Sequence, residues 1–295
     1  MEWKPKFWIS FLLGVIVQPF VFLYLNRLGL FCLYLCVSIF TAIVDWYFSS
    51  YLTLGLVLVI VIHSYFIVRH YNICLPRAWF SKWWGLVAIH AGVLISVTLF
   101  RAFLYEPFTI PARSMNPSLS VGDYIVVEKQ GYGTYGTFGV IFVDNDKVKP
   151  ELMLKGSVYA FYPPNMDAPH VARLIGLPGD RISFKGSDIQ LNGEELSVSF
   201  VSGTTHAETY QEVLANYSYL IQRTIGASHS FSDAYVIPDN AYFFVGDNRD
   251  NSVDSRLYGA VDGNRILGKL ALTLKPNDFT LKTSLSERTK EGEEN

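Results

Sequence analysis

The sequence is short of two things that would narrow its function, namely cysteine and charge. Only three of its 295 residues are cysteine, at positions 32, 36 and 74, so everything after Arg77 lacks a thiol with which to form a disulfide. Lys, Arg, Asp and Glu make up 17% of the chain, the net charge is -2, and no basic stripe is visible. These values exclude the electrostatic footprint of a nucleic-acid-binding protein. We therefore expect no nucleic-acid partner, and cysteine does not reveal the redox compartment.

The chain is instead rich in apolar residues, which lie mostly in its first hundred positions. Half of the sequence is hydrophobic and its mean hydropathy is +0.24, which is too apolar for an ordinary soluble protein. A transmembrane helix needs about 20 predominantly apolar residues. The sequence predicts about four such helices in a membrane domain of residues 1–104, at residues 8–24, 28–47, 51–68 and 83–104.

The connection between the third and fourth predicted spans carries the charge that sets their orientation. It contains Arg69, Arg77 and Lys82 and no acid, so the positive-inside rule places it in the cytoplasm. The fourth span then delivers the polar part of the chain to the outer face. Four spans also leave Lys4 and Lys6 outside, against the same rule, so an arrangement with three spans stays open.

After Glu106 the pattern changes to short alternating segments separated by turns. The pair Asn192-Gly193 lies between two of these segments and is a strong hairpin signal. Regular short strands predict a mainly antiparallel β domain over residues 105–283, with one helix-like piece near residues 207–220. We expect strands at residues 124–128, 158–161, 170–175, 181–184, 188–191, 241–245 and 266–274.

Two parts of the polar region show no sign of a functional site. Residues 187–238 have no cluster of catalytic side chains, and we assign this insertion no role. Residues 284–295 are highly charged and are expected to be disordered.

Three short segments carry the chemistry of the polar domain. The first, IPARSMNPSL at Ile110–Leu119, places Ser114 in a loop bracketed by prolines, soon after the last apolar run. GLPGD follows at residues 176–180 and GDNRDNSVDSR at residues 246–256. A lone Ser-Met pair means little, but the three segments in this order closely resemble the sequence boxes of the bacterial type I signal peptidases.

This resemblance implies transmembrane helices followed by a signal peptidase-like β fold, in which residues 187–238 correspond to a variable β-rich insertion. It implies a chain anchored in the bacterial inner membrane, with the β domain on the outer, periplasmic face. The implied activity is that of a serine endopeptidase that removes leader peptides from exported proteins. Leader peptides and membrane lipid are the implied partners, and the family needs no metal or other cofactor.

Residue by residue, the resemblance makes Ser114 the nucleophile and its backbone N–H a donor to the developing oxyanion. Many members have a serine two residues earlier as a second donor, whereas this chain has Ala112. The family's general base is a lysine four residues before the first glycine of GLPGD, and this chain has Ala172 there. Removal of one member of such a catalytic pair costs several orders of magnitude in rate. The lysine position is therefore vacant.

One other residue is a candidate for a replacement base. His170 lies two residues before Ala172 and shares its face if the segment is a strand, and histidine is a competent base near neutral pH. Two residues of strand shift it by about 7 Å, so direct contact with Ser114 requires a backbone change. Lys155 matches a different family box and has no expected access to Ser114.

The resemblance gives supporting roles to three residues of the third segment. In relatives the residue matching Ser252 helps to orient the lysine, while those matching Asp254 and Arg256 form an ion pair beneath the site. Asp247 and Asp250 are expected to be solvated turn carboxylates rather than a metal pair. In relatives, shallow pockets accept the small side chains at positions −1 and −3 of the leader. Four apolar residues of this chain match the lining of those pockets, although they can also be core residues: Phe108, Ile110, Val171 and Leu119.

The vacant lysine position leaves three versions of this function open. The chain can be an enzyme with an unorthodox base, an engineered inactive form, or a natural non-catalytic relative that binds leader peptides or regulates a partner peptidase. A membrane interaction protein whose β domain docks partners is a further alternative, although such a role does not require the intact segment around Ser114.

Overall fold

The chain divides into two compact units, Met1–Val97 and Thr98–Asn295. The charged tail that the sequence predicts to be disordered, residues 284–295, falls outside the described residues. The computed structural model describes residues 3–48, 50–72, 76–144, 148–186, 188–227, 234–275 and 280–283.

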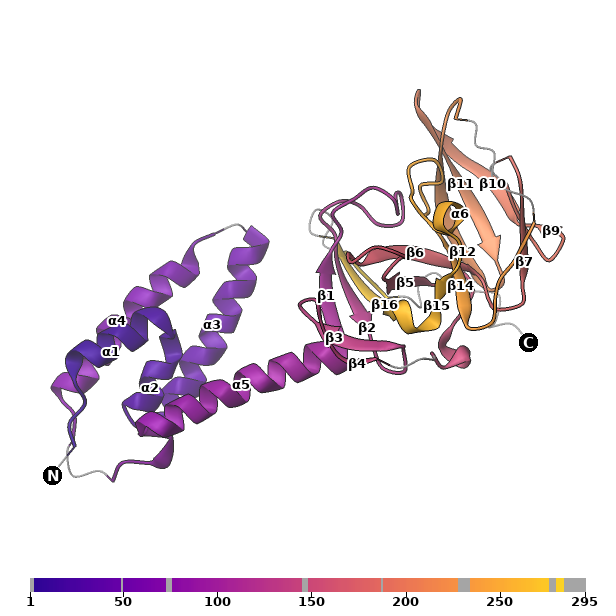
Figure 1. Ribbon diagram of the computed structural model, residues 1–295. Helices are drawn as coiled ribbons and strands as arrows, with labels where there is room; N and C mark the ends of the chain where they lie inside the picture. Colours follow the sequence, from indigo (N-terminus) through magenta and orange to yellow (C-terminus); the bar gives the residue numbers. More distant parts are fainter. Residues whose placement is uncertain are drawn as a thin grey trace, which may run out of the picture. The chain divides into compact units, whose positions relative to one another are not determined.

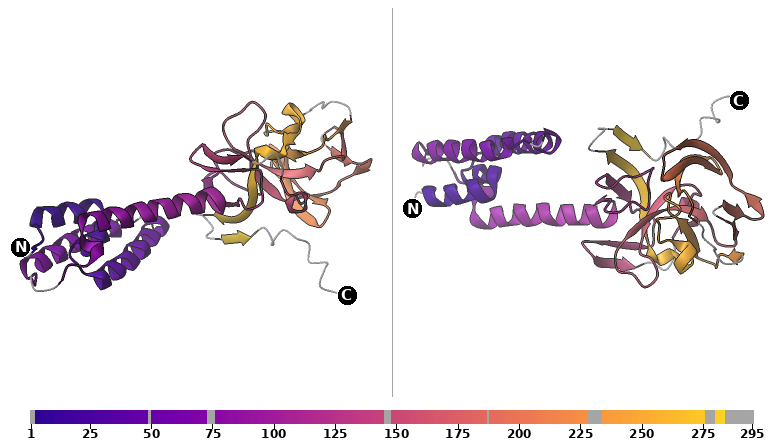
Figure 2. Two further views of the ribbon diagram at one scale, coloured as in Figure 1. Left: turned by 60° about the horizontal axis from the view of Figure 1, so that its bottom comes forward. Right: turned by 90° about the horizontal axis from the view of Figure 1, so that it is seen from above.

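The first unit is helical, as its composition predicts. Helix α1 lies against helix α4 in the views of Figures 1 and 2, where Gly14 lets the two backbones approach, since a Cβ there would lie 3.2 Å from Val61. Two short 3₁₀ turns, η1 (Gln18–Phe20) and η2 (Trp79–Ser81), punctuate the connections. The helices are α1 (Phe7–Ile16), α2 (Val21–Tyr24), α3 (Leu28–Phe48), α4 (Leu52–Arg69) and α5 (Trp83–Phe103).

Three of the described helices, α3, α4 and α5, are long and apolar enough to cross a membrane. The prediction of one continuous helix over residues 8–24 is wrong, because α1 ends at Ile16 after 10 residues. Gln18 has a φ of 44°, and Pro19 has no N–H to continue the helical ladder. The predicted class, apolar helices followed by an antiparallel β domain, is confirmed, with three helices of spanning length and one shorter apolar helix.

Asp45, near the end of α3, caps the start of α4. Its carboxylate accepts hydrogen bonds from the Ser50 hydroxyl at 2.6 Å and from the backbone N–H groups of Leu52 and Thr53 at 2.7 and 2.8 Å. The first N–H groups of a helix have no partner within the helix itself. Asp45 therefore has a structural reason to lie at the end of a span.

The second unit is built on an antiparallel sheet of eight strands, which carries the candidate site (Figure 1). All seven segments predicted as strands are confirmed to within one residue at each end, five of them in this sheet. In spatial order the strands are β1 (Tyr105–Thr109), β2 (Tyr124–Glu128), β16 (Ile266–Lys275), β5 (Val158–Phe161), β6 (His170–Gly176), β14 (Ala241–Val245) and β15 (Val261–Asp262), with β17 (Thr280–Thr283) beside β16.

Three smaller sheets accompany the main one. The predicted hairpin at Asn192-Gly193 is confirmed, with φ values of 55° and 90° that suit its tight turn. Short helical pieces are η3 (Pro150–Leu152), α6 (Ser255–Tyr258) and η4 (Gly263–Arg265). The sheets are β13–β7–β8–β9 (Tyr235–Val236, Arg181–Lys185, Asp188–Leu191, Glu194–Glu195), β10–β11–β12 (Ser197–Gly203, Ala207–Leu214, Tyr217–Thr224) and β3–β4 (Thr134–Thr137, Val140–Asp144).

The helix-like piece predicted near residues 207–220 is wrong. This stretch forms the hairpin of β11 and β12, which turns at Ala215, where φ is 53°. Along β12 the side chains of Tyr217, Tyr219 and Ile221 are buried at a period of two, which is the period of a strand. The local sequence pattern of this stretch fits either a helix or a strand. It forms a strand because β11 pairs with β10 on one side and β12 on the other.

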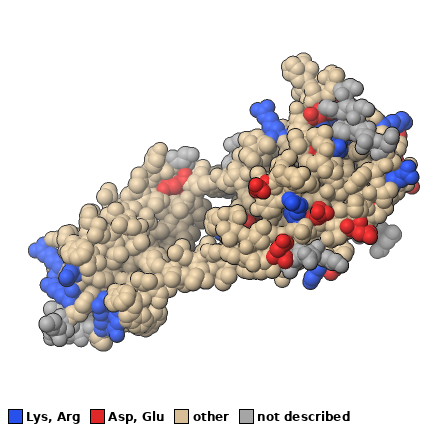
Figure 3. Space-filling view, viewed as in Figure 1, with Lys and Arg blue, Asp and Glu red and all other residues tan. Residues whose placement is uncertain are grey.

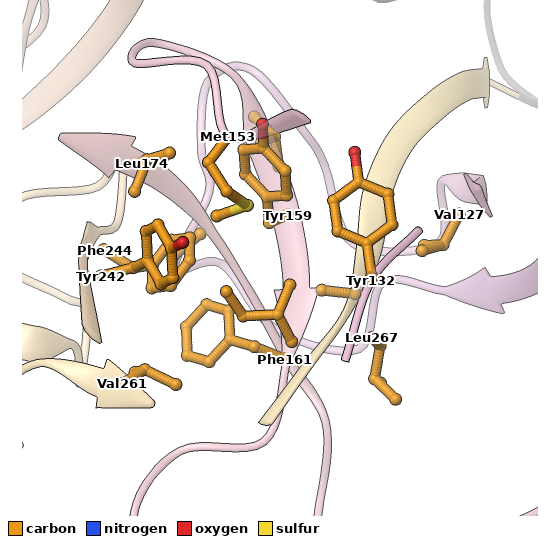
Figure 4. Close-up of a cluster of buried hydrophobic side chains, with 14 of the residues drawn as sticks. Val127, Tyr132, Met153, Tyr159, Phe161, Leu174, Tyr242, Phe244, Val261 and Leu267 are labelled. Atoms are coloured by element: carbon orange, nitrogen blue, oxygen red, sulfur yellow. The ribbon is translucent and has the colours of Figure 1, made fainter. Parts of the chain in front are cut away.

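Strands β6 and β14 separate two hydrophobic cores by the alternation of their side chains. Leu174 and Phe244 point into one core, together with the aromatic side chains drawn in Figure 4. Ile175 and Phe243 point into the other core, under the inserted strands. Ala172 shares the face of Leu174, so the predicted base position lies on the side of the first core.

Candidate active site

The loop that bears Ser114 begins where β1 ends and returns at β2. Backbone hydrogen bonds close its base, from Ile110 N–H to Asp123 O and from Gly122 N–H to Ile110 O, each 2.9 Å. Within the loop, Leu119 N–H donates to Met115 O at 2.9 Å. Met115 and Leu119 are buried in the first core, so they anchor the loop while Ser114 stays half-buried at its surface.

A cavity of about 520 Å³ lies in front of this loop. Its walls come from the loop itself, from β5, from residues 168–172 and from residues 251–253. It brings together the residues that the sequence selected from three distant segments. These are Ser114, His170, Ala172 and Ser252, with Phe108, Ile110 and Val171 of the expected substrate pockets.

Three selected residues do not line the cavity. Leu119 is 3% exposed and belongs to the core. Asp254 and Arg256 form a two-bonded ion pair behind the wall, with Nε–Oδ1 and Nη2–Oδ2 distances of 2.8 and 2.7 Å. The same Asp254 carboxylate accepts the Gly246 N–H at 2.9 Å, and Arg256 donates to Arg249 O at 2.6 Å, so the pair braces the loop of the third segment.

Gly246 lets this third segment approach the Ser114 loop. A Cβ added to Gly246 would collide with the Ser252 hydroxyl and would lie 2.7 Å from the Ser114 carbonyl oxygen. Only a glycine therefore allows Ser252 and the Ser114 backbone to lie on either side of this position.

Asn248 connects the two loops directly, and sequence reasoning missed it. Its backbone N–H donates to Ser114 O at 2.9 Å, and its side-chain amide donates to Arg113 O at 3.0 Å. The Asn248 side chain is itself 4% exposed. Asn248 therefore holds the carbonyls of both Arg113 and Ser114, and nothing in the sequence distinguishes it from the other polar residues around it.

Asp247 is a second residue whose environment the sequence did not reveal. The expectation of a solvated turn carboxylate is wrong, because Asp247 is 1% exposed and pairs with Arg173. The guanidinium makes two bonds to the carboxylate, of 2.8 and 2.7 Å, and donates to Gly156 O at 2.6 Å. It also lies 3.9 Å over the Tyr219 ring. This ion pair joins β6, next to Ala172, to the loop that holds Ser114.

Ala172 itself is 4% exposed and pairs with Tyr159 of β5. None of the described lysines lines the cavity. Lys155 forms an ion pair with Asp180 at 2.7 Å. Burial by itself would raise the pKa of Asp180, but hydrogen bonds from Lys155, Asn192 and Leu177 N–H hold that pKa below its usual value. Lys129 is buried in another pair, with Glu106 at 2.8 Å.

His170 is the titratable base in the cavity wall. Burial lowers the pKa of the imidazole, and this outweighs a hydrogen bond with the Val253 backbone that favours the charged form. A pKa below the usual histidine value favours the neutral imidazole near neutral pH. Both side chains line the cavity, and within the described residues no hydrogen bond joins His170 to the Ser114 Oγ.

Comparison with known proteins decides the family. Residues 82–274 match the family described as signal peptidase, peptidase S26. The chain belongs to this signal peptidase family. Signal peptidase I of Pseudomonas aeruginosa is 36% identical over 194 residues, which cover 60% of this chain and 67% of that protein. Signal peptidase I of Pseudomonas fluorescens is 34% identical over the same length and coverage.

A signal peptidase I crystal structure from Enterococcus faecalis is 28% identical and covers 42% of this chain and 99% of that one. Its TM-score of 0.28 is too low to carry an argument about the fold of this chain. The family assignment therefore rests on sequence, and the three segments quoted above all lie inside the matched region.

Removal of Arg173 tests how strongly the buried ion pair supports this site. Arg173→Ala leaves Asp247 as a buried carboxylate without its main partner, so we expect the unfolding free energy to fall by about 3–5 kcal/mol. Thermal and denaturant unfolding of the detergent-solubilised protein measure the change.

The exposed pair of Lys185 and Glu195 provides the control. Lys185→Ala should change the unfolding free energy by less than about 1 kcal/mol. Equal effects of the two substitutions would contradict a supporting role for Arg173.

Proposed function

We propose that this chain binds the leader peptides of exported proteins in the cavity at Ser114 and cleaves them by attack of the Ser114 hydroxyl. The observation that supports this is the convergence of Ser114, Ala172 and Ser252 on one cavity from three distant segments. A hydrolytic signal peptidase function follows from the family. The remaining question is what replaces the lysine.

His170 is the proposed base, because it lines the same cavity as Ser114. A serine hydroxyl becomes nucleophilic only when a neighbouring base takes its proton. A neutral imidazole has one ring nitrogen without a proton, and that nitrogen can accept one. Catalytic hydrogen bonds that are long in a free enzyme often tighten when substrate binds. A leader peptide that closes the cavity can therefore bring His170 and Ser114 together.

The Ser114 N–H is the oxyanion donor in this proposal. Ala112 supplies no hydroxyl as a second donor, and loss of one such donor costs about a hundredfold or more in rate. The chain is therefore expected to be a slow enzyme, even with a working base.

The leader would bind as an added strand at the cavity. Within the described part of the chain, β1 pairs with β2 alone and lies at an edge of the main sheet, so its outer backbone groups are open to a peptide. Phe108, Ile110 and Val171 line the cavity beside the small residues Ala160 and Ala168. These apolar walls suit the small leader side chains at −1 and −3.

The three spanning helices support the proposed orientation. If the connection between α4 and α5 is cytoplasmic, α5 leads outward, and three crossings leave Lys4 and Lys6 on the cytoplasmic side as well. The positive-inside rule is then satisfied at both places. In Figure 3 Lys and Arg gather at one end of the helical unit, which fits this arrangement. The β domain would lie on the outer face.

The hairpin β3–β4 is the proposed lipid contact of the β domain. Phe138 is 74% exposed, and the four β4 residues from Val140 to Val143 are between 40 and 55% exposed. Arg101, in the last turn of α5, lies 4.3 Å over the Phe138 ring and bonds Thr137 at 3.3 Å. An apolar surface beside the end of a spanning helix is best covered by the membrane.

A second function is a non-catalytic leader-binding relative, in which Ser114 no longer acts as a nucleophile. The observation that favours it is the lack of a hydrogen bond between Ser114 Oγ and His170 among the described residues, together with the methyl group of Ala172 at the lysine position.

Restoration of the lysine tests the proposed site. Ala172→Lys places an amine in a cavity that Ser114 and Ser252 also line, so we expect cleavage of a leader-bearing precursor to increase by about a thousandfold or more. Precursor processing in detergent measures this rate.

Ser114→Ala in the same background should abolish that cleavage. If Ala172→Lys folds with an unchanged melting temperature and still does not cleave, the proposed geometry of the site is wrong.

The pH dependence of the unsubstituted protein tests His170. Because burial lowers the pKa of His170, the base is charged and inactive only below the usual histidine value of about 6.5. We expect kcat/KM to rise with pH and to reach a plateau before neutrality, whereas the Ala172→Lys enzyme should still rise above pH 7.

His170→Gln should remove this cleavage while leaving the Ala172→Lys enzyme active. Unchanged cleavage by His170→Gln would exclude the histidine as base, and no cleavage by the unsubstituted protein would favour the non-catalytic function.

Lipid contact at the β3–β4 hairpin can be measured with a fluorophore on Phe138→Cys, in a background of Cys32→Ser, Cys36→Ser and Cys74→Ser. In vesicles that contain brominated phospholipids we expect strong quenching at this position. Phe200→Cys on β10, an equally bulky residue that is 62% exposed, should be quenched little. Equal quenching at both positions would contradict the proposed contact.

A further inference from the structure

The inserted strands β10–β12 are hydrogen-bonded to residues 247–249, the segment that in turn bonds the Ser114 loop. Gln222 of β12 donates its N–H to Asp247 O at 2.8 Å and accepts the Arg249 N–H at 2.9 Å. These two bonds form a parallel bridge on either side of Asn248. Asn248 is the residue that holds the carbonyls of Arg113 and Ser114.

A buried ion pair adds a second connection between the same two elements. Arg249 reaches into the insertion and pairs with Glu212 of β11. Arg249 is 2% exposed and Glu212 is fully buried, so neither charge can exchange its partner for water. Tyr219 of β12 donates its hydroxyl to the same Glu212 oxygen at 2.7 Å.

These contacts surround Asn248 and connect the insertion to the Ser114 loop. Gln222 fixes the backbone on both sides of Asn248, and Glu212 fixes the side chain of the next residue, Arg249. A displacement of Asn248 would have to break these contacts. Its two donors point to the nucleophile loop, so the insertion is rigidly connected to the backbone of Ser114.

We propose that the inserted sheet β10–β12 positions Ser114, with Glu212 and Asn248 as positioning residues. Glu212 acts through Arg249, and Asn248 acts through the carbonyls of Arg113 and Ser114. The catalytic consequence rests on the proposed function of Ser114, whereas the structural consequence does not. The insertion is thus a part of the active-site support rather than a separate module.

Hydrogen–deuterium exchange of the full chain in detergent tests the structural consequence. Glu212→Gln removes the charge that holds Arg249, so we expect amides of the loop at residues 112–120 to exchange about tenfold faster. The reporters are the bonded amides of Asn116 and Leu119. Amides of β5 and β6 should keep their exchange rates. Unchanged exchange in the loop, or an equal increase in β5 and β6, would overturn the proposal.

Asn248→Ala is a second variant that does not disturb the buried charges. It removes the amide donor to Arg113 O and should accelerate the same loop amides. Asp188→Asn is the matched control, because Asp188 pairs with Arg223 of β12 while being half-exposed. It should leave exchange in the loop unchanged, and acceleration by this control would equally contradict the proposed route.

The kinetic consequence is measured in the Ala172→Lys background. Glu212→Gln and Asn248→Ala should each lower kcat for precursor cleavage about tenfold with KM changed less than twofold, since they disturb the attacking group and not the pocket. An unchanged kcat would overturn the positioning role. If the Ala172→Lys parent itself does not cleave, the proposed function fails, and the exchange experiment still decides whether the insertion positions the loop.

Discussion

The buried ion pair between Arg173 and Asp247 is the interaction on which the site depends. Arg173 follows Ala172 along β6, and Asp247 precedes Asn248, which bonds the Ser114 carbonyl. One pair of side chains thus connects the strand that carries Ala172 to the loop that bonds Ser114. Since both partners are almost fully buried, loss of either would leave a charge without compensation in the interior.

Strand alternation explains how β6 serves two purposes at once. Successive side chains of a strand point to opposite faces, so Ala172 faces the cavity and the first core while Arg173 faces the insertion and Tyr219. A change at position 172 therefore alters the chemistry of the cavity without touching the ion pair behind it. His170, two residues before Ala172, also lines the cavity.

Patterns that depend on a few neighbouring residues could be predicted from the sequence, and those that depend on distant pairing could not. The seven alternating strands and the Asn192-Gly193 hairpin carry their signals locally. The β11–β12 hairpin does not, because its stability comes from pairing with β10 and from the buried Glu212. The burial of Asp247 was equally invisible, since an Asp in a Gly-Asp-Asn turn looks solvated until Arg173, 74 residues away, is placed beside it. At the site, the motifs selected the residues that meet at the cavity but gave no sign of Asn248.

The residues that shape the cavity differ from the residue at position 172, where the family has its base. The contacts that shape the cavity are the ion pairs, the Asn248 bonds and the close approach at Gly246. None of them involves the side chain at position 172, and an alanine there fills its place in the core with a methyl group. The residue at position 172 can thus change the chemistry of the cavity without removing any of these contacts. The cavity at Ser114 can therefore stay assembled whichever residue occupies position 172, because the fold and the proton acceptor depend on different residues.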